Sequence, residues 1–260
     1  MKKFKFKEIK LKGIRTKLTI YFSSLILVVS LVLGLVSMMS SSNALTKEAE
    51  MILETMSKDA ASLTVSRLET NLRTLELISM NDDIKSMDWK IQQPTLEGFI
   101  TKTSLLDIGV VDLNGNTTFT DGTTSSLGDK EYVKRALNGE VNVSDLTVNK
   151  ETNTVILMYA APIKDGNGTI VGALIGKLNG NSLSYITNNI GYGKSGYGYM
   201  LDSNGTIIAH KDGNKVTNQW NPINEANGNE DLTSVASSFQ EMIANKAGVS
   251  KYSFEGRNLY

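Results

Sequence analysis

The sequence feature that most constrains this chain is an uncharged apolar run close to its N-terminus. Residues 18–39 read LTIYFSSLILVVSLVLGLVSMM, which is 22 residues without a charge. At about 1.5 Å of rise per residue, a helix of that length crosses the roughly 30 Å hydrocarbon layer of a membrane. A cleaved signal peptide is the alternative, but its apolar region is normally about 7 to 15 residues long and ends in a small-residue cleavage site. We therefore expect a transmembrane helix over residues 18–39.

The distribution of charge predicts the orientation of that helix. Residues 1–17 hold eight Lys or Arg and one Glu, no basic residue follows until Lys47, and the whole chain has a formal net charge of zero. Because basic flanks stay on the inner side of a membrane, residues 1–17 are expected to be a cytoplasmic tail and residues 40–260 to be extracytoplasmic. A basic tail beside an apolar run suits an anionic membrane leaflet, so no nucleic-acid partner is expected.

Cysteine and histidine, which often bind metals or act in catalysis, are scarce in this chain. It has no cysteine and a single histidine, His210, which excludes disulfides, thiolate metal sites and a histidine cluster for a metal. Residues 191–196 read GYGKSG, but a helical stretch precedes them and a strand follows, which is the reverse of a nucleotide-binding turn. We expect no cofactor, no metal and no enzymatic activity, and we interpret His210 as a strand-end residue and the glycines as a hinge.

A long helix is predicted directly after the apolar run. Apolar residues at Leu45, Ala49, Ile52 and Met56, followed by similar positions up to Leu75, recur at spacings of mostly three and four. The pattern predicts one amphipathic helix within residues 40–80. Packing on its own subunit and packing on a second copy both fit this pattern, and a homodimer through this helix is the expected assembly.

The sequence pattern of the remaining chain predicts an α+β fold with antiparallel sheets. Short runs rich in β-branched and aromatic residues predict strands at residues 107–112, 116–120, 154–163, 169–178, 197–202 and 206–210. Helices are predicted near residues 129–137, 182–189 and 232–245. Residues 112–115, 165–168 and 202–205 each place Asn-Gly between two such runs, which is typical of tight hairpins. VVDLNGNTTFTDG, beginning at Val110, also overlays MLDSNGTIIAHKDG, beginning at Met200, so two similar sheet modules are expected in tandem.

Several segments resemble a known family. SLGDKEYVKRALNGEVNVSDL, TVILMYAAPIKDGNGTIVGALIG and GYGKSGYGYMLDSNGTIIAHKDG, together with AGVSKYSFEGRNLY, are similar to the double Cache sensor domains of bacterial chemoreceptors, sensor kinases and diguanylate cyclases. The resemblance implies two PAS-like modules, a membrane-distal one at residues 81–190 and a membrane-proximal one at residues 191–260. It also implies that the second module is incomplete here and that a second transmembrane helix and an output domain would follow.

The resemblance also implies a function at the cell membrane. We expect the extracytoplasmic ligand-sensing region of a methyl-accepting chemotaxis protein, with a small molecule bound in the distal module. The sensor region of a histidine kinase or a diguanylate cyclase is the first alternative. A surface structural module without a ligand is the second.

Convergent polar residues predict where the ligand binds. Lys130, Tyr132 and Arg135 lie on the predicted short helix, and Tyr159 and Lys177 lie on strands of the same sheet.

Comparison with amino-acid-sensing members of the family adds Ser125, Thr147 and Asn149 to this candidate site. Lys130 and Tyr132 match the family's cation and aromatic residue, whereas Lys177 stands where those members have an Asp. Two lysines in one pocket favour an anion, so the expected ligand is an organic acid rather than a standard amino acid.

Overall fold

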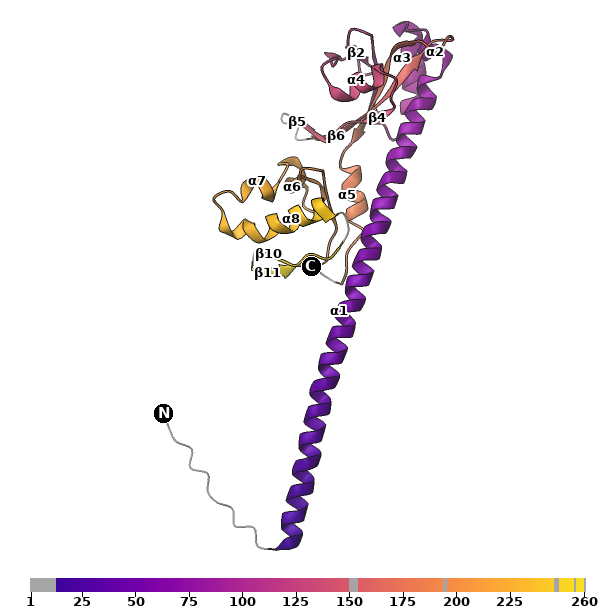
Figure 1. Cartoon of the computed structure of the whole chain (residues 1–260). Coiled ribbons are helices and arrows are strands. Elements are labelled where there is room, and N and C mark those ends of the chain that lie inside the picture. Colours follow the sequence, from indigo (N-terminus) through magenta and orange to yellow (C-terminus); the bar gives the residue numbers. More distant parts are fainter. Residues whose placement is uncertain (1–12, 150–153, 194–195, 246–247, 255, 260) are drawn as a thin grey trace. The chain divides into compact units, whose positions relative to one another are not determined.

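The computed structural model describes residues 13–149, 154–193, 196–245, 248–254 and 256–259 (Figure 1). Residues 1–12 of the predicted basic tail, and Lys194 and Ser195 of the glycine-rich stretch, lie outside this description. The hinge therefore stays a prediction. The chain divides into two units, residues 1–52 and residues 53–260, and each is described by itself.

The first unit consists of the beginning of helix α1 (Ile14–Ser79). Its apolar side chains, such as Leu25, Leu33 and Val36, are exposed on every side of the helix. A helix that is apolar all round is stable when lipid or protein surrounds it. By length and composition, α1 is able to cross a membrane.

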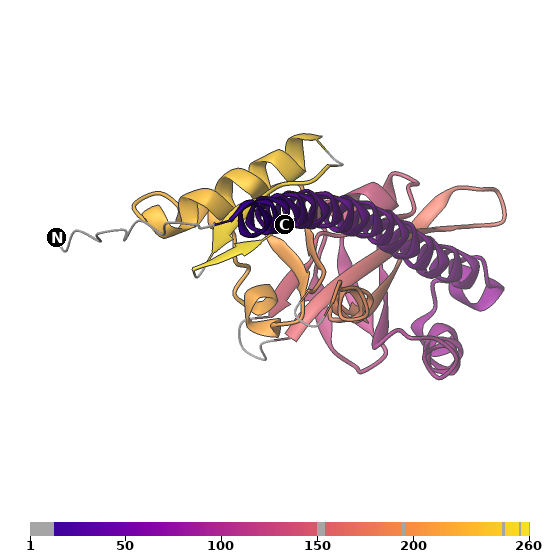
Figure 2. The same cartoon turned by 90° about the horizontal axis from the view of Figure 1, so that it is seen from below.

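The second unit is built on an antiparallel sheet with the strand order β3-β2-β1-β7-β6-β4, and β5 also pairs with β6. β6 and β7 form its longest hairpin, with 11 and 10 residues (Figure 2). The strands are β1 (Asp107–Val111), β2 (Asn116–Phe119), β3 (Thr124–Ser126), β4 (Asn142–Val143), β5 (Thr147–Asn149), β6 (Thr154–Lys164) and β7 (Ile170–Asn179).

Helices cover both faces of this sheet (Figure 1). The end of α1, with α2 (Asp82–Lys85) and α3 (Trp89–Ile100), packs on one face, where Leu75, Ile84 and Leu96 are buried. Helix α4 (Glu131–Leu137) packs on the other face through Val133 and Ala136. Because successive residues of a strand point to opposite faces, each central strand contributes to both cores.

The C-terminal part has its own core, formed by residues such as Ile207, Val216 and Phe239. Helix α5 (Ser182–Thr187) precedes the hairpin of β8 (Tyr199–Leu201) and β9 (Ile207–His210), and His210 ends β9 as predicted. The remaining elements are α6 (Gly213–Thr217), α7 (Pro222–Glu225), η1 (Glu230–Leu232), α8 (Thr233–Asn245), β10 (Tyr252–Phe254) and β11 (Arg257–Leu259).

The three predicted hairpin turns are confirmed. In each turn the glycine amide donates to the carbonyl oxygen of the aspartate three residues earlier, as from Gly115 to Asp112 at 3.0 Å. Each glycine has a positive φ of 83° or 84°, a backbone conformation that side chains disfavour. The aspartate carboxylate also accepts amide hydrogen bonds within its own turn, as Asp112 does from Asn114 and Asn116.

The α+β class and the long helix are confirmed, but α2 and α3 were not predicted from the sequence. Their start signals are present, because the Asn81 and Asp88 side chains accept hydrogen bonds from the first turns of these helices. α2 is only four residues long, and Pro94 inside α3 interrupts its helical pattern. The division at residues 190 and 191 stays a prediction.

Two turn glycines give a matched test of this fold. Gly115 and Gly168 have nearly the same φ, but a Cβ at Gly115 would lie 2.3 Å from the Gly128 Cα, whereas a Cβ at Gly168 would meet nothing within 4 Å. Gly168→Ala should therefore cost only about 1–2 kcal/mol of backbone strain. Gly115→Ala should cost about 1–3 kcal/mol more, because the turn must also move away from the Gly128 backbone.

Thermal unfolding of the full chain in a non-ionic detergent, followed by circular dichroism, measures the difference. At about 2–4 °C per kcal/mol, Gly115→Ala should have clearly the lower melting temperature. Equal melting temperatures for the two variants would contradict the β1–β2 turn described above.

Candidate ligand-binding site

The candidate site lies on the face of the large sheet that α4 covers, called here the α4 face. Its apolar floor consists of Val111, Ala160, Ala173 and Ile175, which pack against the buried residues of α4. α4 begins directly after Lys130, whose backbone is extended at the N-cap position. The predicted residues Lys130 and Tyr132 therefore lie at the start of the helix that covers this face.

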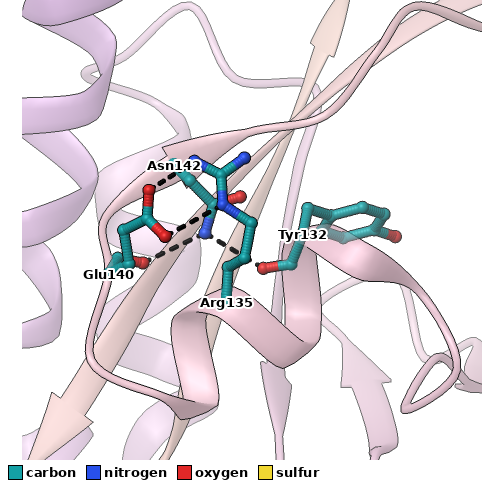
Figure 3. Close-up of polar contacts among 4 residues, drawn as sticks. All are labelled: Tyr132, Arg135, Glu140 and Asn142. Atoms are coloured by element: carbon teal, nitrogen blue, oxygen red, sulfur yellow. Dashed lines mark hydrogen bonds and ion pairs between the residues drawn. The ribbon is translucent and has the colours of Figure 1, made fainter.

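Polar contacts hold α4 against β4 and the residues that lead into it (Figure 3). The Arg135 guanidinium forms an ion pair with the Glu140 carboxylate and thereby lowers the pKa of that carboxyl. Asn142 is only 2% exposed, and its Nδ2 donates to the backbone oxygens of Tyr132 at 3.1 Å and Glu140 at 3.0 Å. The Tyr132 ring points away from this cluster in Figure 3. Arg135, one of the predicted residues, thus has a structural partner already.

Lys130 and Tyr132 have the properties that a binding site needs. The Lys130 Nζ lies 3.2 Å from Asp129 Oδ2, and half of the lysine side chain is exposed. Exposed ion pairs of this kind contribute roughly 0–1 kcal/mol, so this ammonium is free to exchange its partner. Tyr132 packs against the core of the α4 face, and burial, followed by the charge of Asp129, raises the pKa of its phenol. The phenol therefore remains a neutral hydrogen-bond donor.

Strand register places Lys177 and Thr147 on the same face. Lys177 follows Ile175 by two residues in β7, so both side chains point to the same side of the sheet. Thr147 lies opposite Ile156, which packs into the core of the α4 face, and directly opposed residues share a face.

The other two residues added by the resemblance lie on edge strands. Asn149 lies opposite Thr154 in β5 and β6, and its side chain is outside the described part of the structure. Ser125 is exposed on β3.

Tyr159, by contrast, is on the opposite face. It is fully buried beside Leu75 of α1, and its hydroxyl oxygen accepts a hydrogen bond of 3.4 Å from Asn71 Nδ2. The thickness of the sheet separates this tyrosine from α4. The structure therefore does not bring Tyr159 together with Lys130, Tyr132 and Lys177.

A buried carboxylate that was not predicted from the sequence lies next to Lys177. Asp107, the first residue of β1, pairs with Lys177 of β7 in the sheet register, and Lys177 pairs in turn with Met158 of β6. Asp107 is 5% exposed, and its Oδ1 accepts hydrogen bonds from the Thr120 hydroxyl and from the Ile108 amide at 2.9 Å. Its signal in the sequence is a charged residue at the start of an otherwise apolar strand.

A second carboxylate belongs to the same group. Asp121 Oδ1 accepts hydrogen bonds from the Thr123 hydroxyl at 2.6 Å and from its amide at 2.8 Å. These bonds, and then the charge of Lys177, lower the pKa of Asp121. Asp121 therefore stays ionised at neutral pH. The α4 face thus presents two carboxylates and an ammonium in one small area.

Two hollows lie among the described residues of the C-terminal part. One is an open cleft bordered by α8 and residues 249–251, and the other lies among aromatic side chains that include Tyr199 and Trp220. Neither is lined by a residue of the predicted site. Among the residues that the structure describes, no group of three His, Asp or Glu side chains is placed to hold a metal ion.

Comparison with known proteins extends these observations. The sequence profile of the family described as Cache domain matches residues 38–259. No curated protein sequence matches the chain.

Solved structures with a similar fold include ligand-binding domains of bacterial chemoreceptors. That of CtaA from Pseudomonas fluorescens, in complex with L-isoleucine, has a TM-score of 0.63 and 17% identity, and the match covers 84% of this chain and 86% of that one. The sensory domain of Tlp3 from Campylobacter jejuni with isoleucine bound has a TM-score of 0.60 and 14% identity, over 83% and 87%. The domain of PctC from Pseudomonas aeruginosa in complex with GABA has a TM-score of 0.54 and 20% identity, over 65% and 80%.

These structures correct one expectation from the sequence. The prediction of an organic acid rather than a standard amino acid is wrong, because the similar domains hold isoleucine, serine, valine or GABA. The physical reason is that the prediction counted the lysines alone. The register of β1 against β7 places the carboxylate of Asp107 beside Lys177. Asp107 therefore supplies a negative charge at the position where Lys177 stands in place of the family's aspartate.

Proposed function

This chain belongs to the Cache domain family, and from that premise we propose that its outer part is the ligand-sensing region of a membrane-anchored chemoreceptor. The proposed ligand is an amino acid bound between α4 and the sheet. The sensor region of a histidine kinase or a diguanylate cyclase is the alternative output, since the sensing site would be the same. Sensing, and not catalysis, is the proposed role of this region.

The observation that carries the proposal is the mixture of charges on the α4 face. An amino acid is a zwitterion, so its binding site needs acceptors for the ammonium group and donors for the carboxylate. We assign the ammonium group to Asp107 and Asp121, which lie close to Lys177, and the carboxylate to Lys177 and Lys130. Hydrogen bonds between charged groups are about twice as strong as those between neutral groups. The amino acids and GABA held by similarly folded domains support this assignment.

Apolar and aromatic residues beside the charges provide a place for the ligand's side chain. Met158 pairs with Lys177 across β6 and β7, and Ile156 is two residues further along the same face. Tyr132 is partly buried against this core from the helix side. Burying an aliphatic side chain there would contribute about 25 cal/mol per Å² of apolar surface. We propose that an aliphatic amino acid fits this site better than an acidic one.

The packing of α1 offers a route for the signal. Leu75 and Ile78 of α1 are buried on the face of the sheet opposite α4, and the same helix contains the apolar run. A ligand under α4 that favours one packing of the sheet would shift the populations of two α1 positions. We propose that this shift passes through α1 to the membrane.

Calorimetric titration of the full chain with amino acids tests the ligand assignment. We expect binding of an aliphatic amino acid, and a loss of affinity of about tenfold or more in Asp107→Asn and in Lys177→Ala, because each removes one charged partner. Asp107→Asn retains the hydrogen bonds of the carboxylate in nearly the same shape. Lys134→Ala is the matched control, because Lys134 is an exposed lysine on α4.

A ligand without an amino group provides a second test in the same titration. An analogue of the amino acid that lacks its amino group should bind at least tenfold more weakly, since Asp107 and Asp121 would lose their partner. If that analogue binds as well as the amino acid, or if Lys134→Ala weakens binding as much as Lys177→Ala, the assignment is wrong.

The absence of cysteine from the sequence allows a clean test of the proposed location. Phe4→Cys and Ser126→Cys each introduce a single thiol, the first in the basic tail and the second on the exposed strand β3. A maleimide that cannot cross membranes should label Ser126→Cys in intact cells and should label Phe4→Cys only after lysis, because the basic tail stays inside. Labelling of both thiols, or of neither, in intact cells would overturn the proposed topology.

A further inference from the structure

A group of aromatic rings in the C-terminal part lines a small cavity together with one lysine, whose ammonium group lies over two of the rings. Trp220, Phe239, Phe254 and Tyr199, called here the aromatic cage, line a cavity together with Lys215. Trp220 and Phe239 meet edge to face with ring centroids 6.0 Å apart, and Trp220 and Phe254 are 5.5 Å apart. Tyr199 stacks on Phe239 at 5.5 Å. The rings come from β8, α8, β10 and the segment after α6, so the fold itself builds the cage.

Lys215 occupies this cage as a cation. Its Nζ lies 4.2 Å from the ring centroid of Trp220 and 4.8 Å from that of Phe254, within the roughly 6 Å at which a ring face attracts a cation. None of the ion pairs found among the described residues includes Lys215. The rings, and not a carboxylate, are therefore the partners of this ammonium group.

The dimensions of the cage indicate what else it is able to hold. The open space among the rings is only about 10 Å³, room for about one water molecule, so a further group fits here only in place of the Lys215 ammonium. Lysine is a poor occupant, because its ammonium is compact and strongly hydrated and loses much of that hydration among rings. A methylated ammonium group carries the same charge with less hydration, and aromatic cages are suited to such groups.

We propose that the aromatic cage is a second binding site, for a small quaternary or methylated ammonium compound, and that Lys215 is a built-in occupant which the ligand displaces. The cage lies on Tyr199, Trp220, Phe239 and Phe254, none of which is part of the α4 face. This proposal is therefore independent of the amino-acid site. If the cage binds no ligand, the proposed amino-acid site is unaffected, and the reverse also holds.

Tryptophan fluorescence provides a direct measurement, because the sequence has two tryptophans, Trp89 and Trp220. In the full-length Trp89→Phe variant, Trp220 is the only tryptophan, and it reports on the cage. Titration with choline or tetramethylammonium should give a saturable change in its emission. The neutral alcohol 3,3-dimethylbutan-1-ol has nearly the shape of choline without the charge, and it should give no saturable change at the same concentrations.

Removal of the built-in occupant tests the second half of the proposal. Lys215→Met in the Trp89→Phe background keeps a long side chain without the charge, and choline should then bind about tenfold more tightly, because it no longer competes with the lysine. Lys215→Gln is a second variant in case the first does not fold, and Lys134→Met is the control, because Lys134 is an exposed lysine on α4 that does not line this cavity. The proposal is overturned if folded variants show no saturable response, if the neutral alcohol binds as well as choline, or if Lys215→Met leaves the affinity unchanged.

Discussion

The pairing of β7 between β1 and β6 is the constraint on which the candidate site depends. This register places Asp107, Lys177 and Met158 side by side across three strands. A slip of one residue in a strand would move its side chains to the opposite face and would send Lys177 into the core beside α1. Buried apolar residues on both faces oppose such a slip, since Ile175 belongs to one core and Leu174 to the other. The packing of the sheet thus fixes the positions of the charges.

Most of the fold could be predicted from the sequence, because its signals are local. The aspartates and glycines of the three hairpin turns identify the strands on either side, and the apolar spacing before residue 80 identifies the long helix. The boundaries of β1, β6 and β7 agree with the predicted runs to within a residue or two. α3 was not predicted, since Pro94 interrupts its pattern and its start depends on a single capping residue, Asp88.

The site was predicted only in part, because its composition depends on contacts between distant segments. Tyr132, Thr147 and Lys177 were expected to converge, and the structure places them on one face. Tyr159 is a tyrosine like Tyr132 and follows Met158 in β6. Successive strand residues point to opposite faces, so its side chain lies on the face that α1 covers. Asp107 is 70 positions from Lys177 in the sequence, and no local pattern links the two. The ligand prediction considered the lysines without Asp107. For that reason the prediction of an organic acid was wrong.

The measurement that tests this account most directly is a crystal structure of the chain's outer region grown with an aliphatic amino acid. The account predicts density for the ligand between α4 and the sheet, with its ammonium group within hydrogen-bond distance of Asp107 and its carboxylate facing a lysine. Ligand bound only elsewhere, or bound under α4 with its carboxylate against Asp107, would contradict the central claim.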